Sequence, residues 1–440
     1  MKRGVAFLFF TVWAIFLNPA PTIAQEVLSL EEAIKIGLEK NYSIKLVSNN
    51  LEIDRNNVNL ANAGIIPAIT GNLTNNYTIQ NSSQTRATGE VTERKGARNS
   101  NLGYGVGLNW TIFDGFGMFA RYEQLKVLSK LGEANLQIQV ITTVADITNV
   151  YYNLVQQQYQ LQAFRSAIDI SRYRVRTAQS RFEIGKAARL EVLNALVDLN
   201  TDTTNLLRQQ ELYRNTQINL NEILAREVST VFKVADSITI DQTLTLAQLS
   251  GLAQEKNPSL RAALVSRRIA ELDLKQVRAN RFPAIDVNTG YNFNRSESAL
   301  GFATLNTGRG FNYGLSASVN IFNGFLQRRQ EQNAGTLINN AQIDFERVNQ
   351  SVKAQLAAAF QTYQTNLSLV GLEENNQKIA KQNLDITLDK FRLGSITQIE
   401  VREAQLNYIN AQVRYSNAQY QAKLAEIALK EITGSINLIF

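Results

Sequence analysis

Glu400 and Glu403 stand three residues apart, a spacing that places both carboxylates on one face of a helix. Glu191 and Asn194 have the same spacing earlier in the chain. Carboxylates gathered in this way can attract cations or serve a hydrolase, although such a pair is often only a solvated helix face. The sequence shows no pocket-like set of polar residues around them, and long helices offer no concave site. A carboxylate-dependent hydrolase is therefore disfavoured.

The residue types that are missing exclude most other chemistry. The 440 residues include no cysteine and no histidine, so thiol nucleophiles, Ser-His-Asp triads, disulfides and Cys/His zinc sites are ruled out. Any metal site would have to consist of oxygen ligands alone, and we expect neither a metal nor a cofactor. Gly103, Gly105 and Gly107 lie on an alternating segment without the helix start that a nucleotide-binding loop requires.

Residues 1–24 have the three-part pattern of a secretory signal peptide. Lys2 and Arg3 precede an apolar run, and short side chains lead to a cleavage site that we place after Ala24. An anchoring transmembrane helix is the alternative, but the run falls short of the ~20 apolar residues that span a bilayer. Removal of the leader lowers the formal net charge from +7 to about +5, which is too small to indicate a nucleic-acid partner.

The chain repeats itself, with a first structural repeat at 25–225, an equatorial connector at 226–243 and a second repeat at 244–440. The matching positions include Pro67 and Pro283, Gly115 and Gly324, and Gly185 and Gly394. A repeat this long exceeds a solenoid unit and indicates duplication of a structural half.

Each repeat contains two segments in which apolar residues alternate with small polar ones, at 68–80 and 101–113 and again at 284–294 and 311–322. Each is ~10 residues long, the length of a tilted membrane-spanning strand. Their polar side is Asn, Thr, Ser and Gly with almost no charge, as in a channel lumen. A soluble sheet with one wet face is the alternative. Because four strands cannot close in a bilayer, we expect the chain to oligomerise.

The rest of the chain is predicted to be helical, at 30–63, 116–184 and 190–225 and, in the second repeat, at 245–280, 325–393 and 398–433. The long proline-free stretches favour long helices. Each of the two longest would rise ~100 Å, and two half-length helices stacked end to end would match one of them. Leu406, Ile409 and Val413 continue a stripe that predicts coiled-coil packing.

Several short motifs occur in a fixed order, and most of them occur twice. They are Leu28-Ser29-Leu30-Glu31-Glu32-Ala33 with Asn41, Leu244-Thr245-Leu246 with Asn257-Pro258, Phe113-Asp114-Gly115 and Phe322-Asn323-Gly324, and Phe182-Glu183-Ile184-Gly185 and Phe391-Arg392-Leu393-Gly394. With these motifs over nearly the whole mature chain, the sequence resembles the TolC family of outer-membrane efflux proteins.

The resemblance implies an α+β membrane protein in the outer membrane of a Gram-negative bacterium. A homotrimer would form a 12-stranded barrel, continued by a coiled-coil helical tunnel in the periplasm. Its implied function is a passive exit duct of a tripartite efflux or type I secretion system, without enzymatic activity. Its implied partners are a periplasmic adaptor protein, an inner-membrane RND or ABC transporter, and outer-membrane lipid. Without a cysteine to acylate, anchoring would rest on the barrel.

The resemblance also assigns roles to two groups of residues. Adaptor docking at the helix tips falls on Ile184, Gly185, Lys186 and Ala187 and on Leu393, Gly394, Ser395 and Ile396. The constriction of the tunnel falls on Glu400, Glu403, Glu191 and Asn194. Related proteins commonly have aspartate rings there, so the longer glutamates leave the ring diameter open. Rings of carboxylates would favour cations.

A non-channel periplasmic coiled-coil protein remains the main alternative, and it predicts that the protein fractionates as soluble. The cargo also stays open among drugs, metals and proteins. The absence of a Met or His stripe slightly favours small organic substrates.

Overall fold

The computed structural model describes residues 26–235, 237–299 and 303–436, so the predicted leader lies outside the described residues. Two compact units divide the chain. Of the described residues, those within 26–45, 139–256 and 354–436 form a helical unit, and those within 46–138 and 257–353 form a sheet-bearing unit.

The helical unit contains β1 (Glu26–Leu28), α1 (Leu30–Lys40), α4 (Arg189–Ile223), β4 (Phe232–Val234), α5 (Leu246–Lys256) and α8 (Gln398–Thr433). The sheet-bearing unit contains β2 (Ala68–Thr85), β3 (Val91–Asp114), α6 (Pro258–Ala279), β5 (Ala284–Glu297) and β6 (Leu305–Ser318). Three helices contribute to both units, namely α2 (Tyr42–Asn57), α3 (Gly117–Glu183) and α7 (Leu326–Leu393). Among the described residues, no helix is both long and apolar enough to cross a membrane.

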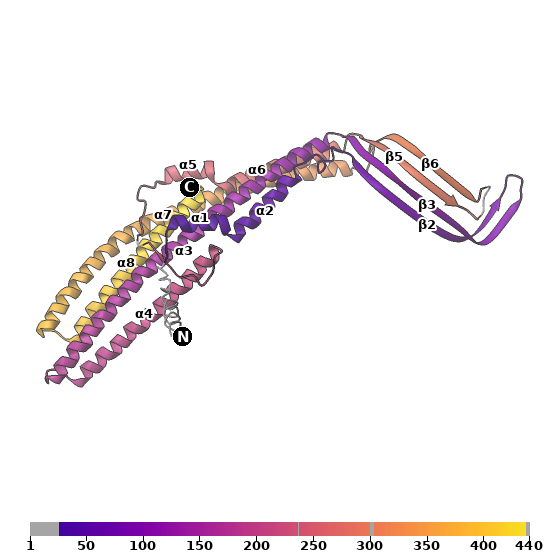
Figure 1. Ribbon diagram of the computed structural model, residues 1–440. Helices are drawn as coiled ribbons and strands as arrows, with labels where there is room; N and C mark the ends of the chain where they lie inside the picture. The colour runs from indigo at the N-terminus through magenta and orange to yellow at the C-terminus, as the bar shows by residue number, and fades with distance from the viewer. Residues whose placement is uncertain (1–25, 236, 300–302, 437–440) are drawn as a thin grey trace, which may run out of the picture. The chain divides into compact units, whose positions relative to one another are not determined.

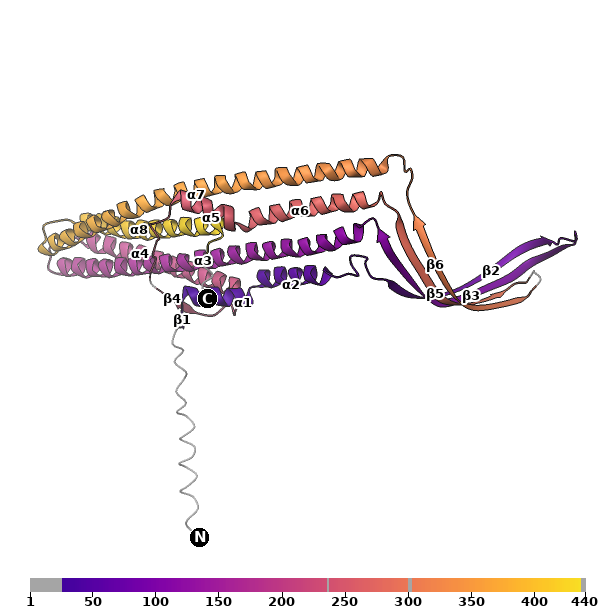
Figure 2. The same ribbon diagram turned by 90° about the horizontal axis from the view of Figure 1, so that it is seen from above.

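The four long strands form one antiparallel sheet in the order β2-β3-β5-β6 (Figure 1). The register aligns Leu73 with Tyr104, Tyr104 with Phe293, and Phe293 with Arg309. The face that carries these residues is largely apolar, and Leu73 is 72% exposed. The opposite face carries amide and hydroxyl side chains such as Asn72, Thr74 and Asn292. Strands β2 and β6 are the two edges of the sheet (Figure 2).

The alternating glycines of β3 make room for the asparagines of β5. A Cβ on Gly105 would lie 2.3 Å from Asn292 Oδ1, and one on Gly103 would lie 3.1 Å from Asn294 Oδ1. Glycine is therefore required where the neighbouring amides lie across the strand. These glycines serve sheet packing, in agreement with our rejection of a nucleotide loop.

Several element boundaries differ from the predicted ones. Strands β2 and β3 extend well beyond 68–80 and 101–113 into their shared hairpin, and β5 likewise extends past 294. Strand β6 runs from Leu305 to Ser318, so it begins and ends earlier than the predicted 311–322. At the hairpin ends of the strands, polar residues that we predicted as loop continue the hydrogen-bonded ladder, since backbone pairing does not depend on side-chain polarity.

The two half-length helices that precede the strands are each broken by an asparagine. The predicted helix 30–63 is two helices, since the side chain of Asn41 accepts hydrogen bonds from Ser43 N and Ile44 N at 2.9 and 3.1 Å. It also ends at Asn57, earlier than predicted. The predicted helix 245–280 breaks at Asn257, which caps Leu260 N at 2.9 Å ahead of a proline at the first helical position. Each break follows from local capping chemistry.

The turns from strand to helix are alike in the two repeats. Gly115 and Gly324 have φ values of 70° and 64°, and the phenylalanines that follow, Phe116 and Phe325, also have positive φ values of 69° and 62°. Asp114 Oδ1 accepts a hydrogen bond from Met118 N at 2.9 Å and so caps α3. Two consecutive left-handed residues, one of them not glycine, form a strained link that recurs at both junctions.

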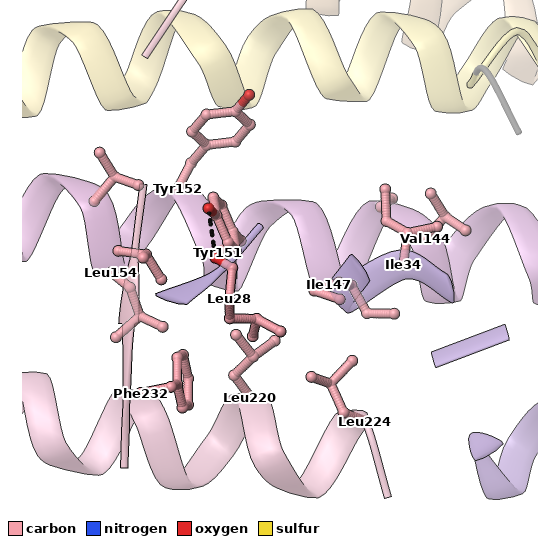
Figure 3. Packing of buried hydrophobic residues seen from close by; sticks show 14 of the residues in the cluster. Leu28, Ile34, Val144, Ile147, Tyr151, Tyr152, Leu154, Leu220, Leu224 and Phe232 are labelled. Atoms are coloured by element: carbon pink, nitrogen blue, oxygen red, sulfur yellow. Dashed lines mark hydrogen bonds between the residues drawn. The ribbon is translucent and has the colours of Figure 1, made fainter. Parts of the chain in front are cut away.

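The core of the helical unit surrounds a two-stranded parallel sheet that the sequence did not predict. Strand β1 pairs with β4, which lies in the predicted connector 226–243. Tyr151 of α3 donates a hydrogen bond to Leu28 O at 3.0 Å and accepts one from Ala235 N at 3.1 Å (Figure 3). The apolar side chains of Leu220 and Phe232 pack beside them in the same cluster. The amino-terminal strand is thereby fixed to the connector.

Candidate functional site

The helical unit ends in two hairpin tips with the same turn chemistry. Gly185 follows α3 with φ 71°, and Gly394 follows α7 with φ 81°. Lys186 N donates to Arg181 O at 2.8 Å, and Ser395 N donates to Lys390 O at 3.1 Å. These are the six-to-one hydrogen bonds of a helix that ends on a left-handed glycine.

The predicted docking residues lie at these tips and are mostly accessible. Ile184 and Leu393 are 66% and 84% exposed, so each tip presents a large apolar side chain to solvent. Both side chains are thus accessible to another protein. Ala187 and Ile396 are half-buried.

One arginine links the two tips. Arg181, near the end of α3, donates from Nη2 to Phe391 O at 2.6 Å and lies over the Phe391 ring at 4.5 Å from its centroid. Phe391 is only 1% exposed, whereas its repeat equivalent Phe182 is 38% exposed. The tips are thus asymmetric, with the second tip's phenylalanine buried under the first tip's arginine.

The four predicted constriction residues are not all in one place within a single chain. Glu191 and Asn194 line a hollow of about 700 Å³ together with Thr397. Glu400 instead forms a capping box, in which its carboxylate accepts from Thr397 N and Thr397 Oγ1 at 3.3 and 2.9 Å. Glu403 is exposed and is not among the residues that line the hollow.

A buried polar cluster lies above the tips, and the sequence did not predict it. Arg174 of α3 donates to Asp198 of α4 at 2.9 Å and to Gln405 of α8 at 3.3 Å. Asp202 of α4 accepts from Arg402 of α8 at 2.8 Å and from Ser171 of α3 at 2.6 Å. The cluster therefore joins three helices that are far apart in the sequence.

Burial shapes the electrostatics of this cluster. The side chain of Arg174 is only 2% exposed, and this desolvation lowers the pKa of its guanidinium, while the hydrogen bond to Asp198 opposes the shift. Arg402 also contacts Asp198 at 3.5 Å, so two arginines share two aspartates. The sequence did contain a weak signal, because Asp198 and Asp202 stand four apart on one face of a helix.

The sequence profile of a family described as "Outer membrane efflux protein" matches residues 34–226 and 249–435, which is most of the chain. The chain belongs to this family. The two matched segments each cover most of one predicted structural repeat, and the predicted resemblance to TolC-type proteins is confirmed.

Individual relatives agree with the family assignment. The chain is 20% identical to "Outer membrane protein TolC" of Escherichia coli (strain K12) over 342 residues, which is 75% of this chain and 69% of the relative. It is 20% identical to "Outer membrane efflux protein BepC" of Brucella suis over 437 residues, covering 96% and 90% of the two chains. The crystal structure of the Campylobacter jejuni CmeC outer membrane channel has the same fold, with a TM-score of 0.77, 14% identity and coverage of 92% and 85%.

This efflux protein is an exit duct in the outer membrane of a Gram-negative bacterium. The predicted α+β fold of long helices and a small set of long strands is likewise confirmed. Within the described residues, no group of three or more acidic side chains is arranged to hold a metal ion.

A second buried polar cluster of the efflux protein holds the connector (226–243) against α7 and α8. Glu426 of α8 is 1% exposed and accepts hydrogen bonds from Lys423 at 3.0 Å, Lys430 at 2.6 Å and Asp241 N at 3.1 Å. Tyr363 of α7 donates to Asp241 O. Lys423 continues the stripe of Leu406, Ile409 and Val413 in the sequence, and a polar residue on such a stripe is a signal of a buried polar contact.

Proposed function

We propose that three copies of this chain assemble into a homotrimeric duct. Three four-stranded sheets would form a 12-stranded barrel in the outer membrane, and the helices would continue it as a periplasmic tunnel. The duct would conduct substrates passively and without catalysis. A periplasmic adaptor and an inner-membrane transporter of the RND or ABC type would deliver them.

The observation that supports this proposal is a sheet with two open edges and one exposed apolar face. Strands β2 and β6 have no neighbour on their outer sides in the described chain. In hydrocarbon each unpaired backbone group is costly, so a spanning sheet has to close. The described chain supplies four long strands, and bacterial barrels need about 8 or more. Closure therefore has to come from further copies.

The helix tips are proposed as the adaptor-docking surface. The exposed apolar side chains of Ile184 and Leu393 support this role, as do the rigid glycine turns at Gly185 and Gly394. Lys186 and Ser395, which follow the two glycines, are exposed as well.

The constriction is proposed to consist of Glu400, Glu403, Glu191 and Asn194 from each of three copies. Glu403 is the strongest candidate for a pore-facing charge, since it is exposed and lies outside the capping box that holds Glu400. Glu400 would combine two roles, because its capping box also starts α8. The rings would favour cations and narrow the entrance.

Disulfide cross-linking between edge strands tests the trimer. The native chain has no cysteine, so engineered pairs would be the only thiols. Cysteines placed in turn at 72–76 of β2 and at 310–314 of β6 should yield a covalent trimer upon oxidation in membranes. A control pair, V106C with Y291C, replaces residues that face each other within one sheet and should cross-link only within the chain. If every β2–β6 pair gave only monomers, the closed trimer would be wrong.

A further inference from the structure

Three arginines lie on the apolar face of the sheet, at the end remote from the helices. Arg98 pairs with Ile79, Arg309 pairs with Phe293, and Arg295 pairs with Leu102. Side chains of paired strand residues lie on the same side of a sheet. Arg98, Arg295 and Arg309 therefore share the face that carries the apolar side chains; we call them the outer arginine set.

Aromatic residues occupy the same face, at the register of Arg309 and on the helix side of it. Tyr104 stacks on Phe293 with ring centroids 4.8 Å apart, and Tyr291 packs edge-on against Phe293 at 5.1 Å. Phe311 and Tyr313 follow on β6 at 6.3 Å from each other. Aromatic residues of this kind form girdles at the interface between hydrocarbon and headgroups.

The position of the arginines beside this girdle is significant because charge on a lipid-facing surface is costly at the bilayer centre and nearly free at the interface. Arg309 is at the register of the aromatic residues, and Arg295 and Arg98 are two and six residues further along the strands toward the β2–β3 hairpin. The outer arginine set therefore borders the aromatic residues on the side where the hydrocarbon would end. Strand β3 continues past Arg98 to Val91, and the hairpin tip carries Arg86 and Glu90 in an ion pair at 3.1 Å. That end of the hairpin extends past the interface.

The set has an excess of positive charge. Arg295 pairs with Glu297 on the same face at 2.6 Å. Arg98 and Arg309 are exposed, and neither takes part in the ion pairs found among the described residues. Arg295 and Arg309 are also diagonal neighbours on adjacent strands, about 7–8 Å apart, so an anion between them would relieve their repulsion.

We propose that the outer arginine set binds the phosphate groups of lipids in the outer leaflet. Guanidinium groups bind phosphate through paired, charge-assisted hydrogen bonds, and phosphate is the anion that a lipid presents at the depth of the girdle. The inference rests on the proposed function, because it requires the apolar face of the sheet to lie in the membrane with the β2–β3 hairpin outside. It deepens that function by naming the lipid chemistry that holds the barrel at a fixed depth.

A lipid titration of the full processed protein in nonionic detergent tests the inference. The probe is lipid A with both phosphates, compared with the same lipid after dephosphorylation and with inorganic phosphate alone. Thermal unfolding at rising lipid concentration gives an apparent affinity. The variant R98Q/R309Q leaves the Arg295–Glu297 pair intact and should weaken binding of the phosphorylated lipid about tenfold. The control R86Q/K95Q removes the same charge nearer the hairpin tip and should bind as the wild type does.

Three results would overturn the inference. The dephosphorylated lipid could stabilise the protein equally, inorganic phosphate alone could reproduce the effect, or the two double variants could behave alike. Ion conductance of the same preparations separates this failure from failure of the duct. A conducting protein without a phosphate preference contradicts only the lipid site, whereas a protein that never conducts contradicts the proposed function.

Discussion

Arg174 of α3 and Asp198 of α4 form an ion pair at 2.9 Å in which the arginine side chain is almost fully buried. The same guanidinium reaches α8, where it donates to Gln398 O at 3.4 Å. Its charge is removed from water, and its hydrogen-bond partners among the described residues lie on α4 and α8. We expect such a group to specify the register of the three helices more than it adds stability, because burial of an ion pair costs about what the pairing returns.

Removal of one partner from this cluster should be strongly destabilising. Asp202→Ala takes away the acceptor of Arg402, Ser171 and the Gln405 amide. Arg402 would keep only Asp198, at 3.5 Å, which it shares with Arg174. Two largely buried arginines with one anion between them cost about 3–5 kcal/mol. We expect a loss of that order in the free energy of unfolding, measured by denaturant titration of the detergent-solubilised protein.

The matched control is Asp169→Ala, which removes a partner of Arg172 at 3.7 Å with both side chains more than half exposed. Its effect should be about 0–1 kcal/mol. Equal losses for the two substitutions would contradict the structural role of the cluster.

Glu400 allows its helix-capping role to be separated from its charge. Glu400→Ala removes both, and the lost capping box should cost about 0.5–2 kcal/mol of stability. Glu400→Gln keeps an acceptor for Thr397 and should fold with little loss. If the charge governs the constriction, Glu400→Gln combined with Glu403→Gln should lower the cation preference, seen as a shifted reversal potential in a salt gradient. An unshifted potential would remove both residues from the proposed constriction.

A side chain at either tip glycine would have room, but the backbone conformation there is unfavourable for residues other than glycine. A Cβ on Gly185 would meet nothing within 4 Å, yet its φ of 71° is unfavourable for other residues. Gly185→Ala should therefore cost about 1–2 kcal/mol through backbone strain alone. Gly185→Asn, which tolerates the left-handed region better, should recover part of that loss. Thermal unfolding of the two variants checks the order, and equal midpoints would rule out strain as the cause.

Glu431 should make stability depend on pH. Burial raises its pKa above the usual value, the nearby Asp146 raises it further, and the hydrogen bond from Thr142 at 3.4 Å opposes the shift. The folded state thus holds its proton to a higher pH than the unfolded state does. Stability from this group is present at low pH and is lost as the pH rises from about 4.5, the ordinary pKa of a glutamate, through the higher folded pKa.

Glu431→Gln should therefore raise the thermal midpoint at pH 7.5 and leave it unchanged near pH 4. Glu222→Gln, at an exposed position of α4, serves as the control and should shift the midpoint at neither pH. A Glu431→Gln effect of equal size at both pH values would point to packing instead of ionisation.

Features with a local cause could be predicted from the sequence. Period-two alternation located all four strands of the sheet, and Gly185 and Gly394 located the tips, because these patterns act through near neighbours. The Asn257-Pro258 pair was also a readable capping signal, and its helix break was missed because apolar periodicity continues across it.

The pairing of β1 with β4 and the Arg174 cluster could not be predicted. Their partners come from segments far apart in the sequence, and strands of three residues carry no pattern. The roles of the tip and constriction residues stay predictions.

Ion conduction by the purified, processed protein in a planar lipid bilayer tests the duct most directly. We expect discrete channels with a small, cation-preferring conductance, since the tunnel would be narrow at its acidic tips. Protein that is recovered in the soluble periplasmic fraction and never conducts would contradict the account and leave a periplasmic coiled-coil protein in its place.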